Sequence, residues 1–442
     1  MTTLPLLINS QADKPIFWYE DKIITHKKFI ADVALIAKTL AKHKHAINLC
    51  EDRYLFALSF AACILQQQIS LMPANRAKKE IEDLEQDYND SHRIDDSLIK
   101  SLLASKAIAN SPPSLEIDVS QLAAIVFTSG SSGKPKANPK QWGMLVDSAQ
   151  RVATQLKLNQ SSQHTLVATV PPQHMYGFET TIVFPLVTGV CVHNSKPFFP
   201  DDIRQIIPAI NEPVILVTTP VHLRACKQAG LEWPAIDFIL SATAPLSTQL
   251  ATDSEKELKT TLHEIYGCSE AGVVATRSTT KNSAWTLLPG YSFSEKLTGT
   301  CLHTPFSKEE ILLPDQIQQI DSQHFNLLTR QSDLVKIAGK RGSLNDLKIK
   351  LCSIEGVDDA AFFMPDEHVN EKTRLAAFVI APTLDIKDIN ILLSCQIDRA
   401  FIPRPLIKVE KLPYNETGKL PRQNLLTLFK QQRSHSSLKD SA

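Results

Sequence analysis

Residues 128–136 concentrate side chains that suit phosphate binding. The segment reads Thr-Ser-Gly-Ser-Ser-Gly-Lys-Pro-Lys, so it contains Thr128, Ser129, Gly130, Ser131, Ser132, Gly133, Lys134 and Lys136. Glycine lets the backbone approach a ligand closely, and successive N–H groups with hydroxyls form a concave anion site that lysine charges complete. The glycine spacing differs from that of a Walker A loop. The segment therefore predicts a polyphosphate site, with an ordinary polar turn as the alternative.

Four segments in this order resemble motifs of the adenylate-forming superfamily, which includes acyl-CoA synthetases, aryl-acid ligases, luciferases and peptide-synthetase adenylation domains. They are the loop at 128–136, Tyr266-Gly-Cys-Ser-Glu270, Asp315 with Arg330 fifteen residues later, and Asn415-Glu-Thr-Gly-Lys-Leu-Pro-Arg422. The resemblance covers about residues 15 to 428. It implies an enzyme that uses ATP and Mg²⁺ to convert a carboxylic acid into an acyl-adenylate.

The resemblance also assigns residues around ATP. The phosphates would be held by Thr128, Ser129, Gly130, Ser131, Ser132, Gly133 and Lys136, and the nucleoside by Tyr266, Gly267, Ser269 and Asp315. Glu270 would bind Mg²⁺, which prefers oxygen ligands and commonly combines a protein carboxylate with phosphates and water. Judged without the resemblance, Glu270 is a charge at a helix N-terminus and Tyr266 is a core tyrosine.

Three further residues would take part in the chemistry. Lys419 would bridge the carboxylate and the α-phosphate while charge builds on them, and Arg330 would help to hold ribose or phosphate. His174-Met-Tyr-Gly177 resembles the motif at the mouth of the family's acyl pocket. A solvated turn lysine and a core histidine are the alternatives. The segment lacks the Asp of amino-acid-activating relatives, and Glu179 does not match its position, so the resemblance favours a substrate without an α-amino group.

The elements that position these residues follow an α/β pattern. From residue 122 onward, apolar strand candidates at 122–128, 165–170, 214–219 and 236–240 alternate with helix-like segments, which predicts mixed or parallel sheets. In such sheets ligands bind where strands end, which is where the phosphate loop lies. An amphipathic helix is expected at 25–43, with Thr25 as its cap.

We expect a large AMP-binding domain of several subdomains at residues 1–330, a hinge at 331–333, a small mobile α+β domain at 334–430 and a disordered tail at 431–442. Relatives usually carry Asp two residues after the arginine, whereas this chain has Ser332 there and Asp333 next. The pivot residue is therefore left open. Rotation about the hinge would withdraw Lys419 and bring in residues 335–342 for the second half-reaction.

Composition sets limits on the partners. The chain has 442 residues with 47 basic and 47 acidic side chains, so net charge gives no argument for nucleic acid or a membrane surface. No apolar stretch is long enough to predict a membrane span. Eight cysteines without a Cys-x-x-Cys pair indicate reduced, mostly buried thiols and a cytoplasmic protein.

The leading interpretation is an AMP-forming ligase that passes the acyl group of a small carboxylic acid to CoA or to a separate phosphopantetheinyl acyl carrier protein. Residues 171–177 and 336–344 look most like ligases of aryl-polyene or xanthomonadin-type pigment clusters, which load hydroxybenzoate-like acids. Medium or long-chain fatty acids are the alternative substrates. A non-catalytic nucleotide-binding relative and an amino-acid-activating domain are the alternative functions.

Overall fold

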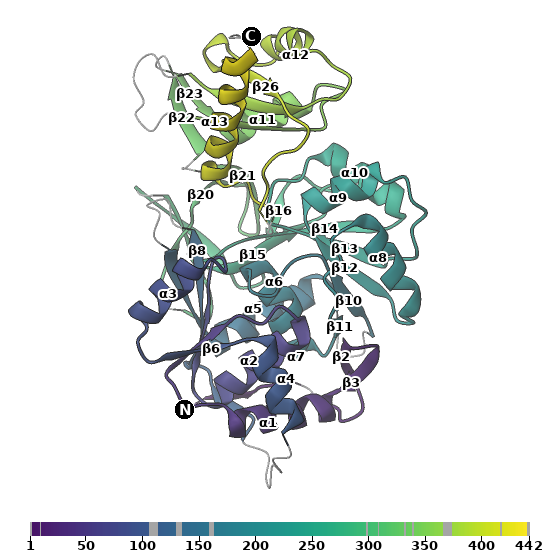
Figure 1. Ribbon diagram of the computed structural model, residues 1–442, viewed down its shortest axis with the longest axis vertical. Coiled ribbons are helices and arrows are strands. Elements are labelled where there is room, and N and C mark those ends of the chain that lie inside the picture. Colours follow the sequence, from purple (N-terminus) through teal and green to yellow (C-terminus); the bar gives the residue numbers. More distant parts are fainter. Residues whose placement is uncertain are drawn as a thin grey trace. The chain divides into compact units, whose positions relative to one another are not determined.

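The chain of the computed structural model divides into two units. The large unit comprises Met1–Leu313 with Ile320–Phe325, and the small unit comprises Pro314–Gln319 with Asn326–Ala442 (Figure 1). The structure describes residues 2–8, 10–105, 114–129, 135–158, 163–297, 299–307, 309–330, 333–337, 340–365, 374–415 and 418–439. Gln331 and Ser332 of the expected hinge lie outside these ranges, so the domain boundary at 330 stays a prediction.

The larger sheet of the large unit is built around parallel strands. Its strands run in the order β16–β15–β14–β13–β12–β10–β11–β2–β3. All neighbours from β14 to β2 are parallel, whereas β15, β16 and β3 are antiparallel to their neighbours. The bounds are β2 Pro15–Tyr19, β3 Lys22–Thr25, β10 Thr165–Ala168, β11 Cys191–His193, β12 Val214–Thr218, β13 Phe238–Ser241, β14 Thr261–Cys268, β15 Gly272–Arg277 and β16 Trp285–Leu287. Beyond β16, β21 (His324–Arg330) pairs through His324 and Phe325.

A second sheet in this unit carries the phosphate-loop strands. Its order is β6–β4–β5–β8–β9, with β6 Ser91–Ile94, β4 His45–Asn48, β5 Ile69–Met72, β8 Leu122–Ser129 and β9 Pro135–Gln141. The first four strands are parallel, and β9 returns antiparallel to β8. The loop between β8 and β9 therefore emerges at the carboxyl end of a parallel strand, where ligands of such sheets bind.

Helices cover these sheets. They are α1 His26–Thr39, α2 Arg53–Leu65, α3 Lys78–Asp87, α4 Asp96–Ala104, α5 Trp142–Gln155, α6 Met175–Phe178, α7 Phe184–Thr188, α8 Pro200–Ile206, α9 Pro220–Gln228 and α10 Thr248–Leu258. Between α6 and α7 lies a π-helical turn, η1 (Glu179–Val183), and a 3₁₀ turn, η2 (Ile207–Ala209), follows α8. Thr25 caps α1 as predicted, since its hydroxyl accepts the Lys28 N–H at 3.3 Å.

Helices α8, α9 and α10 lie beside the strands β10, β12, β13 and β14 (Figure 1). Apolar side chains of these helices pack onto the strands. This hydrophobic core contains Leu223 and Leu250 of the helices and Leu216 and Ile239 of the strands. Strands β10, β12 and β13 are almost entirely apolar, which is typical of parallel strands covered on both faces. Smaller sheets join β1 (Thr3–Pro5) to β7 (Glu116–Asp118), and β17 (Ser292–Lys296) to β18 (Gly299–His303) and β19 (Ile311–Leu312).

The small unit is an α+β fold. Its strands are β20 (Asp315–Gln319), the end of β21, the hairpin β22 (Leu334–Ile337) with β23 (Lys340–Ser343), and a sheet of β24 (Asp359–Phe363), β25 (Ala376–Ile380) and β26 (Leu406–Lys408). Its helices are α11 (Leu344–Cys352), α12 (Ile386–Ser394), the 3₁₀ turn η4 (Arg399–Phe401) and α13 (Arg422–Lys439).

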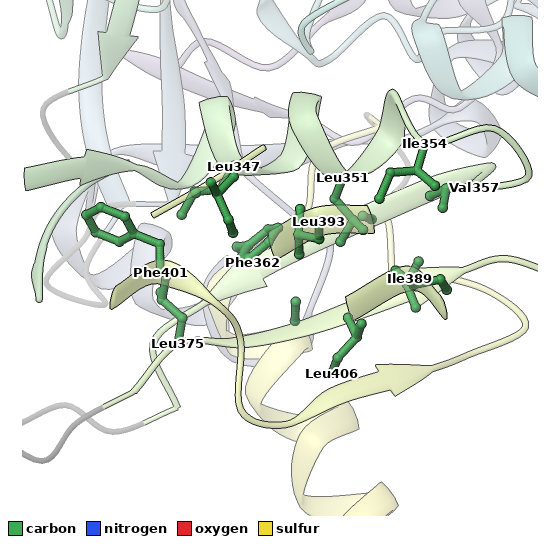
Figure 2. Close-up of a cluster of buried hydrophobic side chains, with 14 of the residues drawn as sticks. Leu347, Leu351, Ile354, Val357, Phe362, Leu375, Ile389, Leu393, Phe401 and Leu406 are labelled. Atoms are coloured by element: carbon green, nitrogen blue, oxygen red, sulfur yellow. The ribbon is translucent and has the colours of Figure 1, made fainter. Parts of the chain in front are cut away.

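Both faces of the small unit's sheet are covered. On one face Leu347 and Leu351 of α11 and Leu393 of α12 meet Phe362, as Figure 2 shows. On the other face Leu425, Leu426 and Phe429 of α13 pack against Phe363 and Phe378. This alternation follows from the period of two in a strand. Helix α13 continues to Lys439, so it extends into the segment from 431 for which the sequence predicts disorder.

Candidate functional site

The phosphate loop connects the antiparallel strands β8 and β9. Thr128 on β8 pairs with Lys136 on β9, and Ser129 pairs with Pro135. The Thr128 hydroxyl also accepts a hydrogen bond from the Asn138 side chain at 3.4 Å. Gly130, Ser131, Ser132, Gly133 and Lys134 lie outside the described residues, as does the side chain of Ser129. The described strands thus fix where the loop begins and ends.

Glu270 lies beside this loop. It belongs to the Glu270 turn, residues 269–271, which joins β14 to β15 and also contains Ser269. The Lys136 ammonium contacts the Glu270 carboxylate at 2.6 Å, although 134 residues separate them in the sequence. The structure therefore brings together a predicted phosphate ligand and the predicted metal ligand.

The electrostatics of Glu270 keep it ionised. Burial by itself would raise the pKa of this carboxyl group, but the hydrogen bond and the charge of Lys136 hold the pKa below its usual value. Its side chain retains 29% of its accessible surface. A partly exposed, ionised carboxylate next to a phosphate loop fits a divalent cation that also takes phosphate and water ligands. Among the described residues no group of three His, Cys, Asp or Glu could hold a metal ion by itself.

Tyr266 and Gly267 shape the strand that leads to the Glu270 turn. The Tyr266 ring is buried, with its centroid 5.7 Å from that of Trp285 and 5.9 Å from that of Phe325. These are the contacts of a core tyrosine, and its contact with adenine stays a prediction. The β14–β15 register shifts at Gly267, where a Cβ atom would lie 2.4 Å from the Gly272 carbonyl oxygen. Glycine is therefore required at this bulge.

The segment His174–Gly177 starts α6. The His174 ring caps this short helix by accepting the Tyr176 N–H at 3.3 Å, and the Tyr176 hydroxyl donates to the Leu240 carbonyl at 2.9 Å. A Cβ atom on Gly177 would lie 2.0 Å from the Pro171 carbonyl oxygen, so no larger residue fits. His174, Tyr176 and Gly177 therefore each have a structural role, and the catalytic role of His174 stays a prediction.

Arg53, which no sequence motif singled out, binds the same region. This fully buried guanidinium donates to the Thr181 hydroxyl at 2.6 Å and to the carbonyls of Ala168 and Val170 at 3.1 and 3.0 Å. It thereby ties the end of β10 to η1. Burial lowers its pKa to about 10, so it stays charged at neutral pH.

Two more residues that sequence reasoning did not assign, Lys140 and Glu179, contact the segment around Glu270. Lys140 on β9 is fully buried and donates to the Glu270 carbonyl oxygen at 2.8 Å. Glu179 begins η1, and its carboxylate accepts the Val273 N–H at 3.3 Å. Burial raises the pKa of Glu179 to about 7, and the charge of Lys140 opposes that rise. π-Helical turns often mark functional sites.

The remaining predicted residues belong to the small unit. Asp315 is the first residue of β20 and is partly buried, and Arg330 ends β21 with its side chain outside the described residues. Lys419 is exposed in a turn that Asn415 closes, because the Asn415 side chain accepts the Lys419 N–H at 2.9 Å and the Asn415 N–H donates to the Lys419 carbonyl at 2.9 Å. Their roles stay predictions.

Six of the eight cysteines are buried and all eight are free thiols, as expected. In the described part of the chain, no helix combines the length and the apolar character needed to cross a membrane.

Comparison with known proteins places the chain in a family. A family model described as AMP-binding enzyme matches residues 36–295. A 4-coumarate–CoA ligase of Halorhodospira halophila is 26% identical over 258 residues, which are 58% of this chain and 63% of that ligase, less than two thirds of its length. A putative long chain fatty acid–CoA ligase of Staphylococcus epidermidis is 24% identical over 329 residues, 69% of this chain and 71% of that protein.

Solved structures agree in fold. The o-succinylbenzoate CoA synthetase of Bacillus subtilis in complex with its acyl-adenylate intermediate matches with a TM-score of 0.81 and 17% identity, over 96% of this chain and 98% of that one. The same synthetase with ATP and a magnesium ion matches with a TM-score of 0.79 and 16% identity, over 93% and 96%. The likeness confirms the expected α/β fold class.

The family match spans more than half of the chain, so the chain belongs to the AMP-binding enzyme family. This confirms the expected family of AMP-binding enzymes. The aryl-polyene sub-family stays a prediction.

Proposed function

We propose that this enzyme is an ATP-dependent acid–CoA ligase. In the first half-reaction a carboxylate oxygen attacks the α-phosphorus of ATP, and pyrophosphate leaves. In the second, a thiol sulfur attacks the acyl carbon, the thiol proton is lost and AMP leaves. The observation that carries the proposal is the 2.6 Å contact between Lys136, at the end of the phosphate loop, and Glu270.

The residues of the large unit would bind and orient the nucleotide. Thr128, Ser129, the loop residues 130–133 and Lys136 would surround the β- and γ-phosphates. Glu270 would hold Mg²⁺, which when bound neutralises phosphate charge and orients ATP. On phosphate binding Lys136 would exchange the Glu270 carboxylate for a phosphate oxygen, which releases Glu270 for the metal. The ATP and magnesium of the Bacillus synthetase structure support this choice of cofactors.

The small unit would supply the remaining contacts. Asp315 would accept hydrogen bonds from the ribose hydroxyls, and Arg330 would hold ribose or phosphate. Lys419 would stabilise the charge that develops between carboxylate and α-phosphate. Because Lys419 lies on a turn closed by Asn415, its amine extends from a defined backbone. We further propose that rotation at residues 331–333 removes Lys419 before thiol attack.

An aromatic, hydroxybenzoate-like acid is the proposed substrate, in the manner of an aryl-polyene-type ligase. The coumarate and o-succinylbenzoate ligases among its relatives support an aryl acid. The fatty acid–CoA ligase among them keeps medium and long-chain fatty acids as the second candidate. The acceptor would be CoA or a separate carrier protein, and the enzyme would act in the cytoplasm.

The test is pyrophosphate release with benzoates, cinnamates and fatty acids, followed by thioester formation with CoA or carrier protein. Release with an aromatic acid and transfer to CoA is the expected result. Release only with fatty acids would overturn the aryl assignment. ATP binding without release for any acid would overturn the ligase and favour a non-catalytic relative. Exchange with amino acids but not with their des-amino analogues would favour an amino-acid-activating enzyme.

A further inference from the structure

Lys140 contacts the backbone of the candidate metal site rather than its carboxylate. It lies four residues after Lys136 on β9, is 0% exposed, and donates to the Glu270 carbonyl oxygen at 2.8 Å. Hydrogen bonds from a charged donor are roughly twice as strong as neutral ones. The Glu270 turn is only three residues long. Fixing this carbonyl therefore restricts the backbone at Glu270 and, with it, the direction of the Glu270 side chain.

Glu179 contacts the strand that follows this turn. Its carboxylate accepts the N–H of Val273, the second residue of β15. Gly272, between that contact and the turn, has a φ of +77°, and a Cβ atom there would lie 2.5 Å from a Glu179 carboxylate oxygen. Glycine thus permits both the left-handed backbone and the close approach of Glu179.

The two side chains are electrostatically matched. Burial lowers the pKa of Lys140 and raises that of Glu179, and the opposite charge of each counteracts the shift of the other. Glu179 also lines a cavity of about 20 Å³ together with Ser148 of α5 and Val273. Removing one partner would leave the other charge in an interior site without compensation, which is costly.

We propose that Lys140 and Glu179 are positioning residues that hold the middle of the Glu270 turn and the start of β15 after it, so that the Glu270 carboxylate keeps the orientation required for Mg·ATP. The inference rests on the proposed function in one respect, that Glu270 serves the metal. Residues that orient a metal ligand typically change metal affinity by 10- to 100-fold when they are replaced.

The experiment measures ATP affinity by calorimetry as a function of Mg²⁺ concentration, a readout that does not require turnover. Lys140→Met is expected to raise the Mg²⁺ concentration for half-maximal tightening of ATP binding by about 10-fold or more. Glu179→Gln keeps an acceptor for the Val273 N–H, so a smaller increase is expected. Lys408→Met is the matched control, because Lys408 also donates to backbone carbonyls, those of Pro382 and Leu384, at 3.0 and 3.1 Å.

A purely structural role would lower stability without changing the Mg²⁺ response of the folded protein. If Lys140→Met does not fold, the double variant Lys140→Met/Glu179→Gln removes both charges and is measured instead, with the same expected increase. An unchanged Mg²⁺ response in a folded Lys140 variant overturns the inference, as does wild-type ATP binding that ignores Mg²⁺. Failure of the ligase proposal would instead appear as normal Mg²⁺-dependent ATP binding without pyrophosphate release.

Discussion

Lys136 and Lys140 lie on the same face of β9, because residues an even number apart share a face of a strand, yet their surroundings differ completely. The Lys136 side chain is 60% exposed and contacts the Glu270 carboxylate. Lys140 is 0% exposed and contacts the Glu270 carbonyl. Lys136 contacts the carboxylate that would bind the metal, whereas Lys140 contacts the backbone of the same residue.

Exposure, rather than charge, distinguishes the two lysines. An exposed ion pair contributes at most about 1 kcal/mol, so Lys136 can exchange its partner for phosphate at little cost. A buried lysine has no water to replace a lost partner, so Lys140 keeps its contact. Under the proposed function, a lysine would serve as an exchangeable phosphate ligand at one end of β9 and as a fixed support at the other.

The largest expected effect is on stability when the buried lysine is lost. Lys140→Met should lower the free energy of unfolding by about 3–5 kcal/mol, because it leaves the Glu179 carboxylate without its opposite charge. Urea unfolding at pH 8, where Glu179 is ionised, measures the change. The double variant Lys140→Met/Glu179→Gln should recover much of the loss. A loss below about 1 kcal/mol would place Lys140 in the same class as Lys136.

A third lysine extends the comparison to the small unit. Lys419→Ala should slow adenylation by roughly 10²–10³-fold, since it removes a cation from developing charge. Thioester formation from supplied acyl-adenylate should continue. Single-turnover assays of each half-reaction measure the two effects, and equal losses in both would contradict the role assigned to Lys419.

The partner of Lys140 should make stability depend on pH. The pKa of Glu179 is raised to about 7 in the folded state, so between the ordinary glutamate pKa and about 7 the folded state retains a proton that the unfolded state has lost. Unfolding free energy should therefore fall as pH rises through this range. Relative to Glu179→Gln, the wild type should lose at most about 3 kcal/mol. Parallel stability–pH curves for the two proteins would refute the raised pKa.

The smallest effect belongs to the exposed lysine. Lys136→Met should change the free energy of unfolding by less than about 1 kcal/mol, because its ion pair is open to solvent. ATP affinity should nevertheless fall. Unfolding and calorimetric titration on one preparation test both statements. A large loss of stability with unchanged ATP binding would reverse the roles of Lys136 and Lys140.

The sequence predicts the fold well where local pattern determines structure. The apolar runs that become β8, β10, β12 and β13 are continuous, and Thr25 gives α1 a recognisable cap. The short strand β6 was not predicted, because Ser-His-Arg-Ile has no apolar alternation and is held by its pairing with β4. The polar tail from 431 was expected to be disordered, but it continues a helix anchored by Leu425, Leu426 and Phe429.

The residues of the candidate site likewise fall into those that the sequence could predict and those that it could not. Lys136 and Glu270 could be named because the segments that contain them resemble motifs of the adenylate-forming superfamily. Lys140, Glu179 and Arg53 could not, because a charged residue in sequence is ordinarily read as exposed, and their burial depends on partners far along the chain. Lys140 and Glu179 are 39 residues apart, and only the folded sheet and η1 bring them to the segment around Glu270.

A crystal structure of the protein with ATP and Mg²⁺ would show whether Lys136 and Glu270 belong to the nucleotide site. We expect that Glu270 binds the metal directly or through water, that the Lys136 ammonium moves to a phosphate oxygen, and that Lys140 stays on the Glu270 carbonyl. Nucleotide bound elsewhere, with the contact between Lys136 and Glu270 intact, would contradict it.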